Sequence, residues 1–194
     1  MLNIDLGNEG GGGPYLAWSA KGTEDGQIDP RTFYLRESDG KTPVDAKKGM
    51  VLDLSTLKTG WCHSEGAAGV APNWQWNQSP SLMAASPGKD WKKGMSIRVG
   101  LPGGKSATWE QSGQAAWLAL THLAPQLSEK HDPNQLPKVK LVAADPVKFT
   151  KGATVVPKLD IDAWIDRPES LMAEGVAVAT EPEPASPPSD DDLF

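Results

Sequence analysis

Glycine and proline are spread along almost the whole of this chain, with 20 Gly and 17 Pro among 194 residues. Both residue types interrupt helices and strands, so they leave mostly short runs in which regular structure can form. Only residues 108–124 have the length and apolar spacing of a helix, with Thr108 and Gln111 as a capping box and Pro125 as the end. With 38% hydrophobic residues, the sequence predicts a loop-rich, mainly β domain.

The chain ends in a Pro-, Ser- and Glu-rich segment that cannot bury a core. Seven of the 25 Asp and Glu residues lie from Glu169 onward, where there is no Lys or Arg, so the other 18 nearly balance the 19 Lys and Arg. We therefore expect a flexible Gly-rich leader at 1–13, one domain at 14–168 and a disordered acidic tail at 169–194. An acidic tail on a body with basic strands indicates an anionic ligand for which the tail can compete.

Several classes of protein are not expected from the composition. No apolar run reaches the roughly 18 residues of a membrane span, and the N-terminus lacks the basic and apolar parts of a secretory signal. A single cysteine, Cys62, rules out an internal disulfide framework and favours the reducing cytoplasm. With only three histidines, a Cys/His zinc site is not expected. We expect a cytoplasmic protein without a metal, a cofactor or contact with a membrane.

Strands are predicted at residues 15–18, 32–37, 50–61, 94–101, 138–144 and 154–165. Strands followed by one helix and two closing strands are typical of the oligonucleotide-binding (OB) barrel. The predicted fold class is therefore mainly β: an OB-fold-like five-stranded barrel with one helix between strands 3 and 4, long loops and a disordered tail.

Alternation along each strand assigns side chains to faces. In residues 50–61, Met50 and Leu52 are predicted to point inward, and Asp53, Leu57 and Trp61 outward. The outward positions of several predicted strands carry basic or aromatic side chains. The core would then lie on one side of these strands and a polar surface on the other.

Aromatic residues in the stretch between residues 63 and 93 are interleaved with basic ones. Trp74 and Trp76 fall on one side of an extended segment, about 6.5 Å apart, and Trp91 directly precedes Lys92 and Lys93. Bases stack on aromatic rings while cations attract phosphates, so we expect one open groove for unpaired nucleotides. Its candidate residues are Tyr34, Arg36, Lys47, Lys48, Trp61, Trp74, Trp76, Trp91, Lys92, Lys93, Arg98, Lys138 and Lys140.

No catalytic constellation stands out, and the protein is predicted not to be an enzyme. Residues 100–106 resemble a phosphate loop, but three residues separate Gly100 from the Gly-Lys-Ser where the motif needs four. Cys62 and His63 are neighbours on a predicted strand, so their side chains point to opposite faces and cannot act as nucleophile and base. The aspartates between residues 160 and 166 have no second acidic motif with which to hold a metal.

The acidic end of the chain, Asp190-Asp191-Asp192-Leu193-Phe194, is similar to the phenylalanine-ended tip of bacterial and phage single-strand binders. Motifs in the body add to this similarity: Arg31-Thr32-Phe33-Tyr34-Leu35-Arg36, Lys48-Gly49, Thr59-Gly60-Trp61 and Trp164-Ile165-Asp166-Arg167-Pro168. On these residues the chain resembles phage-type single-stranded DNA-binding proteins.

The resemblance implies a protein that coats single-stranded DNA without strong sequence preference during phage DNA replication or recombination, in the host cytoplasm. It also implies a partner-binding tail that competes with DNA for the groove and recruits replication and recombination proteins. The tail residues concerned are Asp190, Asp191, Asp192, Leu193 and Phe194. Homo-oligomer formation is left open. Two alternatives remain: a virion or assembly protein whose aromatic residues form the core, and a carbohydrate-binding β module whose tryptophans stack on sugars.

Overall fold

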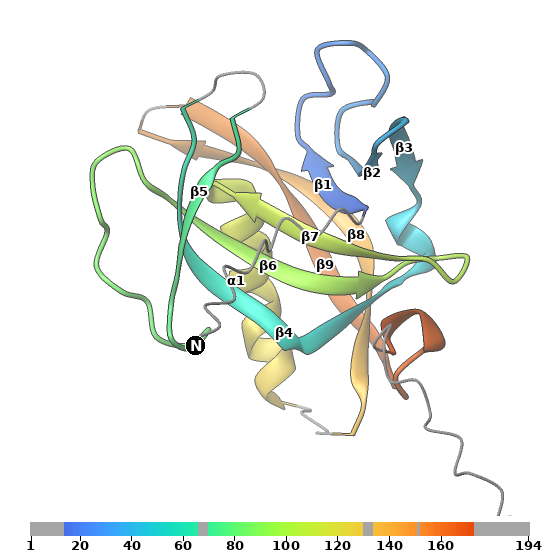
Figure 1. Ribbon diagram of the computed structural model, residues 1–194. Coiled ribbons are helices and arrows are strands. Elements are labelled where there is room, and N and C mark those ends of the chain that lie inside the picture. Colours follow the sequence, from blue (N-terminus) through green and yellow to red (C-terminus); the bar gives the residue numbers. More distant parts are fainter. Residues whose placement is uncertain (1–13, 66–69, 130–133, 151, 173–194) are drawn as a thin grey trace, which may run out of the picture.

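A computed structural model describes residues 14–65, 70–129, 134–150 and 152–172 (Figure 1). The strands are β1 (Tyr15–Ser19), β2 (Thr32–Glu37), β3 (Gly40–Val44), β4 (Met50–His63), β5 (Asn73–Trp76), β6 (Lys92–Gly100), β7 (Ser106–Ser112), β8 (Leu136–Phe149) and β9 (Gly152–Ile165). The helices are α1 (Gln114–Glu129) and two short 3₁₀ turns, η1 (Ala46–Lys48) and η2 (Glu169–Leu171). None of the helices in these ranges has the length and apolar character needed to cross a bilayer.

The strands form one nine-stranded sheet in the order β3-β2-β1-β7-β6-β4-β8-β9, with β5 paired to β4. The β1–β7 pair is parallel and the others are antiparallel. The sheet curls into a half-barrel, and α1 packs on one side of it, mainly against β9 (Figure 1). The mainly β class is confirmed. The five-stranded barrel is not what the structure shows, because β3, β5 and β7 add strands where loops or helix were expected.

The predicted start of the helix is wrong. Residues 106–112 form β7, where Ala107 and Trp109 are buried, and the Gln111 side chain accepts hydrogen bonds from the Trp18 backbone N–H (2.9 Å) and the Trp109 indole (3.2 Å). Pairing of residues 106–112 with β1 and β6 outweighs the helical spacing of their apolar side chains. Gly113, with φ of 102°, then separates strand from helix.

The predicted end of the helix is also wrong, because Pro125 lies inside α1. The last turn is held from outside: the Gln126 amide oxygen accepts a hydrogen bond from the backbone N–H of Ile161 in β9 (3.0 Å). That contact compensates for the helical hydrogen bond that proline cannot donate. The same hydrogen bond gives an acceptor to a backbone N–H on β9, the strand at the edge of the sheet.

The core fixes the strands that carry the candidate site. Phe33 in β2, Trp18 in β1 and Trp109 in β7 pack ring against ring, with centroids 4.9 and 5.2 Å apart. On β6, Ile97 and Val99 are buried, as alternation predicts. The face assignments made for β2 and β6 are therefore confirmed for their core residues. We call the side of the sheet that carries this core the inner side and the other the outer side.

The face assignment made for β4 is wrong after Asp53. Asp53 pairs with Arg98 and Lys58 pairs with Ser96, so β4 advances five residues while β6 advances two. This bulge contains an odd number of steps on β4, so the alternation reverses across it. Trp61 consequently lies on the inner side, not on the outer side with Asp53. Asp53 itself is 2% exposed.

The folded body continues past Pro168, where the sequence places the end of the domain. Leu171 in η2 is buried and packs with Val51 and Leu136, and Arg167 forms a two-atom ion pair with the Asp53 carboxylate. The predicted tail contacts at residues 190–194 and the predicted leader at 1–13 lie outside the described residues.

Candidate functional site

Lys93 lies between two indole rings that come from different elements. Its Nζ is 5.9 Å from the Trp61 ring centroid and 5.2 Å from that of Trp117. Trp61 and Lys93 are cross-strand partners on β4 and β6. Trp117 belongs to the first turn of α1, which begins next to β6 because Gly113 N–H donates to the Lys93 carbonyl (2.8 Å). Residues from β4, β6 and α1 thus meet at the Lys93 ammonium group, which makes a cation–π contact with each of the two rings.

Two further rings extend this group. His63 is two residues beyond Trp61 and Trp91 two residues before Lys93, so alternation places both on the same side of the sheet. Their ring centroids are 5.6 Å apart. We call Trp61, His63, Trp91, Lys93 and Trp117 the lysine–indole cluster. Lys93 is exposed and the aromatic members are half-buried, so part of the surface of each ring is open to a ligand.

The loop at residues 77–91 is anchored beside the lysine–indole cluster. The buried hydroxyl of Thr59 donates to the Pro80 carbonyl (3.0 Å) and accepts from the Asn77 amide (2.9 Å). The Trp61 indole N–H donates to the Ala84 carbonyl (3.0 Å). The sequence predicts an irregular stretch here. The structure shows an irregular loop whose path is set by hydrogen bonds from β4.

Trp74 and Trp76 in β5 form a separate group on the outer side. Their rings stack with centroids 4.4 Å apart and planes 8° from parallel. The prediction that both lie on one side of an extended segment is confirmed, but each ring covers a face of the other. Trp74 also rests on Gly94, where a Cβ would lie 2.6 Å from Cζ3 of the indole. We call Trp74 and Trp76 the indole pair.

Two titratable groups lie near the indole pair. Burial raises the pKa of Glu110, while Ser96, Lys58 and Trp74 act in the opposite direction. Burial, and to a smaller extent the charge of Glu110, raises the pKa of the Cys62 thiol. A buried thiol with a raised pKa is a poor nucleophile at neutral pH.

The remaining predicted cations are distributed elsewhere. Lys47 and Lys48 lie in η1, and the side chain of Lys138 passes close to Gly49. This group adjoins the start of β4, whereas Trp61 is near its other end. Lys140 forms an ion pair with Asp162 (2.8 Å).

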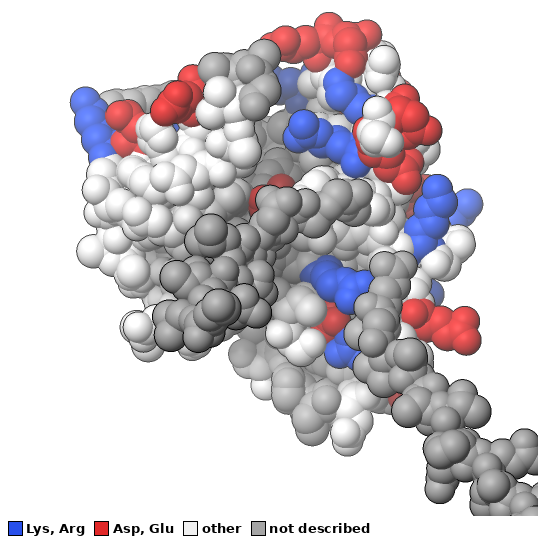
Figure 2. All heavy atoms as spheres, viewed as in Figure 1, with Lys and Arg blue, Asp and Glu red and all other residues white. Residues whose placement is uncertain are grey.

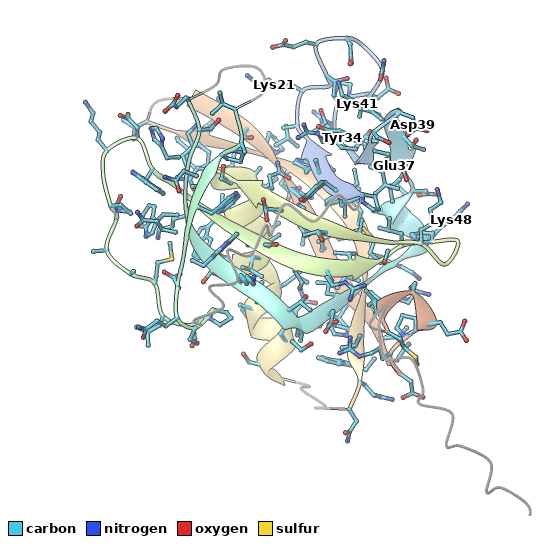
Figure 3. All side chains as sticks on the ribbon, viewed as in Figure 1. Lys21, Tyr34, Glu37, Asp39, Lys41 and Lys48 are labelled. Carbon is cyan, nitrogen blue, oxygen red and sulfur yellow. The ribbon has the colours of Figure 1, made fainter. Side chains whose placement is uncertain are left out.

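Tyr34 and Arg36 lie on β2 and Arg98 on the outer side of β6. Figure 3 shows Tyr34 and Lys41 away from β5, towards β3. Lys92 opposes Cys62 and so shares the outer side with the indole pair. The structure thus brings Trp61, Trp91 and Lys93 together but does not bring all thirteen predicted residues into one groove.

The distribution of charge follows the same division. On the face drawn in Figure 2, Lys, Arg, Asp and Glu gather together over β1, β2 and β3, and the surface beside β5 at the left of the view is mainly uncharged. A surface of mixed sign does not by itself attract a polyanion. At the β4–β5 end, the candidate surface consists of aromatic side chains and a small number of local cations.

Trp117 and His63 are the cluster residues that sequence reasoning missed as binding candidates. The misplaced start of the helix hid Trp117, because a helix that begins at Gln114 turns that ring towards Lys93. An aromatic residue in the first helical turn after a glycine was the available signal. The sequence brings His63 into view only as a base for Cys62 or as a zinc ligand, and neither is expected.

No family model, curated protein or solved structure matches this chain. Within the described residues, no group of three or more His, Cys, Asp or Glu side chains is arranged to hold a metal ion.

Proposed function

We propose that this protein binds single-stranded DNA without strong sequence preference and catalyses no reaction on it. The observation that carries the proposal is the position of Lys93 Nζ within 6 Å of the Trp61 and Trp117 ring centroids. Every base has a face that can stack on an indole, and such stacking contributes about 1–3 kcal/mol per base. An ammonium group between the rings suits the phosphates that join stacked bases.

The lysine–indole cluster is suited to strand binding because its rings are held in place before a ligand arrives. The Trp61 indole is tied to Ala84, and Trp117 is fixed at the junction of β6 and α1. Rings already ordered lose little conformational freedom on binding. Lys93 has to exchange its cation–π contact for a phosphate, at a cost of about 0.5–1 kcal/mol for an exposed site. A charge-assisted contact with phosphate offsets that cost.

The other predicted residues have supporting roles in this proposal. The outward face of the indole pair, next to Lys92, is a second stacking surface on the opposite side of the sheet. Lys47, Lys48 and Lys138 attract phosphate through the longer-range field, which salt screens. As the resemblance implies, the acidic tail competes for the cluster and recruits replication or recombination proteins.

The test is a titration of tryptophan fluorescence with oligo(dT) at several salt concentrations. Quenching that weakens as salt rises is expected, because released counterions make affinity fall with the logarithm of salt. Lys93→Gln should weaken binding and reduce the magnitude of the salt slope by about 1. Lys21→Gln is the matched control, because Lys21 is an exposed lysine on the β1–β2 connection (Figure 3).

The same titration separates the rival functions. Binding to neutral glycans with no dependence on salt would favour a carbohydrate-binding module. A large closed assembly without DNA, measured by native mass spectrometry, would favour a virion or assembly protein. The absence of quenching by oligo(dT) at low salt would remove the single-strand proposal.

A further inference from the structure

A cavity of about 470 Å³ lies on the outer side of the sheet, away from the lysine–indole cluster. It is bounded by the β6–β7 turn and by η2, which contacts β6 (Figure 1). Its volume falls within the roughly 300–1,000 Å³ of small-molecule sites. Its lining includes Arg98 from β6, Lys105 from the turn, Ser106 and Thr108 from β7, and Ser170 from η2. We call it the Arg98 cavity.

Arg98 is a half-buried cation that has no charge partner among the residues that the structure describes. Among the described residues, its guanidinium has no hydrogen bond or ion pair, and its backbone N–H donates to the Thr56 hydroxyl (2.9 Å). Its cross-strand neighbour Asp53 is the nearest carboxylate in register. Both Asp53 oxygens are already taken by Arg167, and one also accepts from Ser55. The charge of Arg98 therefore remains available to a ligand at the cavity.

Hydroxyl groups from two elements, β7 and η2, line the same cavity. Ser106, Thr108 and Ser170 have no side-chain hydrogen bond within the part of the chain that the structure describes. Thr108 is the direct partner of Arg98 across β6–β7, so its side chain lies on the same side of the sheet. An arginine fork next to several hydroxyl donors matches the oxygens of a phosphate group.

The charges around the cavity favour an anion without saturating it. Of the described residues that line it, Arg98 and Lys105 are basic and Glu169 is acidic. Lys105 is also 4.0 Å from Glu37, and its side chain is 68% exposed. Exposed pairs of this kind are worth little, so Lys105 can turn to a ligand. Arg98 is the fixed group because its neighbours Ile97 and Val99 are buried in the core.

We propose that the Arg98 cavity binds a phosphate group, held by the Arg98 guanidinium and the surrounding hydroxyls. The group comes either from a free phosphate or mononucleotide, or from the backbone of a bound strand. The second source rests on the proposed function; the first does not. In both cases the cavity is a second contact surface, distinct from the lysine–indole cluster.

The experiment uses the full chain, Arg98→Gln, and Arg31→Gln as the control. Arg31 is an exposed arginine just before β2. Inorganic phosphate, thymidine 5′-monophosphate and oligo(dT) with a 5′-hydroxyl are added in turn. The backbone amide signals of Gly104 and Thr108 are followed by NMR, and thermal melting confirms that each variant is folded.

Shifts of these amide signals with phosphate or the mononucleotide would establish a site for a free phosphate, provided that the apparent affinity falls at least tenfold in Arg98→Gln but not in Arg31→Gln. Shifts with oligo(dT) alone, with the same loss in Arg98→Gln, would establish a strand phosphate. No shift with any probe, or an equal response from Arg98→Gln, would overturn the proposal. Phosphate binding without fluorescence quenching by oligo(dT) would remove only the strand-binding function.

Discussion

Replacing Arg167 by Gln should destabilise the protein more than the loss of any surface ion pair. Asp53 is 2% exposed, and its carboxylate accepts hydrogen bonds from both terminal nitrogens of the Arg167 guanidinium. Removing the arginine leaves a buried charge whose remaining partner among the described residues is Ser55, and such losses cost about 3–5 kcal/mol. Because the Arg167 side chain is 37% exposed, water can reach part of the site. We therefore expect a value near the lower end, about 3 kcal/mol.

Thermal and urea unfolding measure this cost. For a domain of this size, about 3 kcal/mol corresponds to a fall in Tm of roughly 6–12 °C. Lys140→Gln is the matched control, because it removes an exposed ion pair with Asp162 worth at most about 1 kcal/mol. The double variant with Asp53→Asn should recover much of the loss, since no buried charge then remains. Equal Tm values for Arg167→Gln and Lys140→Gln would refute the reasoning.

The same pair predicts a dependence on pH. Burial alone would raise the pKa of Asp53, but the hydrogen bonds from Arg167 and Ser55 and the charge of Arg167 hold it below its ordinary value of 3.8. A lowered pKa in the folded state contributes stability that is present above pH 4 and lost as pH falls through the folded pKa. Asp53→Asn should therefore flatten the fall in stability below about pH 4. An unchanged acid limb in that variant would contradict the role of the pair.

Three other substitutions or reagents test separate contacts. Gly94→Ala should destabilise the protein by about 1–3 kcal/mol, because its Cβ would meet Trp74, and the shortened side chain of Trp74→Leu should relieve part of this. Thr59→Val should release the loop at 77–91, measured as faster trypsin cleavage after Lys89; an unchanged rate would show that the two Thr59 hydrogen bonds do not hold it. Cys62 should resist a thiol reagent in the native protein at pH 7 and react in urea, and rapid native labelling would contradict the burial of the thiol.

Much of the β structure could be predicted, because it depends on local alternation. Phe33 and Leu35 on β2, and Ile97 and Val99 on β6, are buried as the period of two requires. The β4 bulge could not be predicted, since residues 53–58 contain no glycine or proline to mark it. Asp53 keeps the outward face that alternation predicts, but its burial there could not be predicted, because it depends on Arg167, 114 residues away in sequence.

The site shows the same division between local and long-range information. Its aromatic and basic composition is visible in the sequence, and so is the proximity of Trp91 to Lys93. The grouping of these residues is not, because Trp61 changes sides at the bulge and Trp117 reaches Lys93 only through the junction of β6 and α1. Alternation alone therefore predicts one groove. Register and topology instead place these residues on separate surfaces.

Indole N–H resonances offer the most direct test of strand binding at the lysine–indole cluster. The eight tryptophan side chains give separate signals that single Trp→Phe variants can assign. Adding oligo(dT) should shift the signals of Trp61, Trp91 and Trp117, while those of Trp18 and Trp109, hydrogen-bonded in the core, stay in place. If the three cluster signals remain unmoved while the protein is saturated with DNA, the strand binds elsewhere and the account is contradicted.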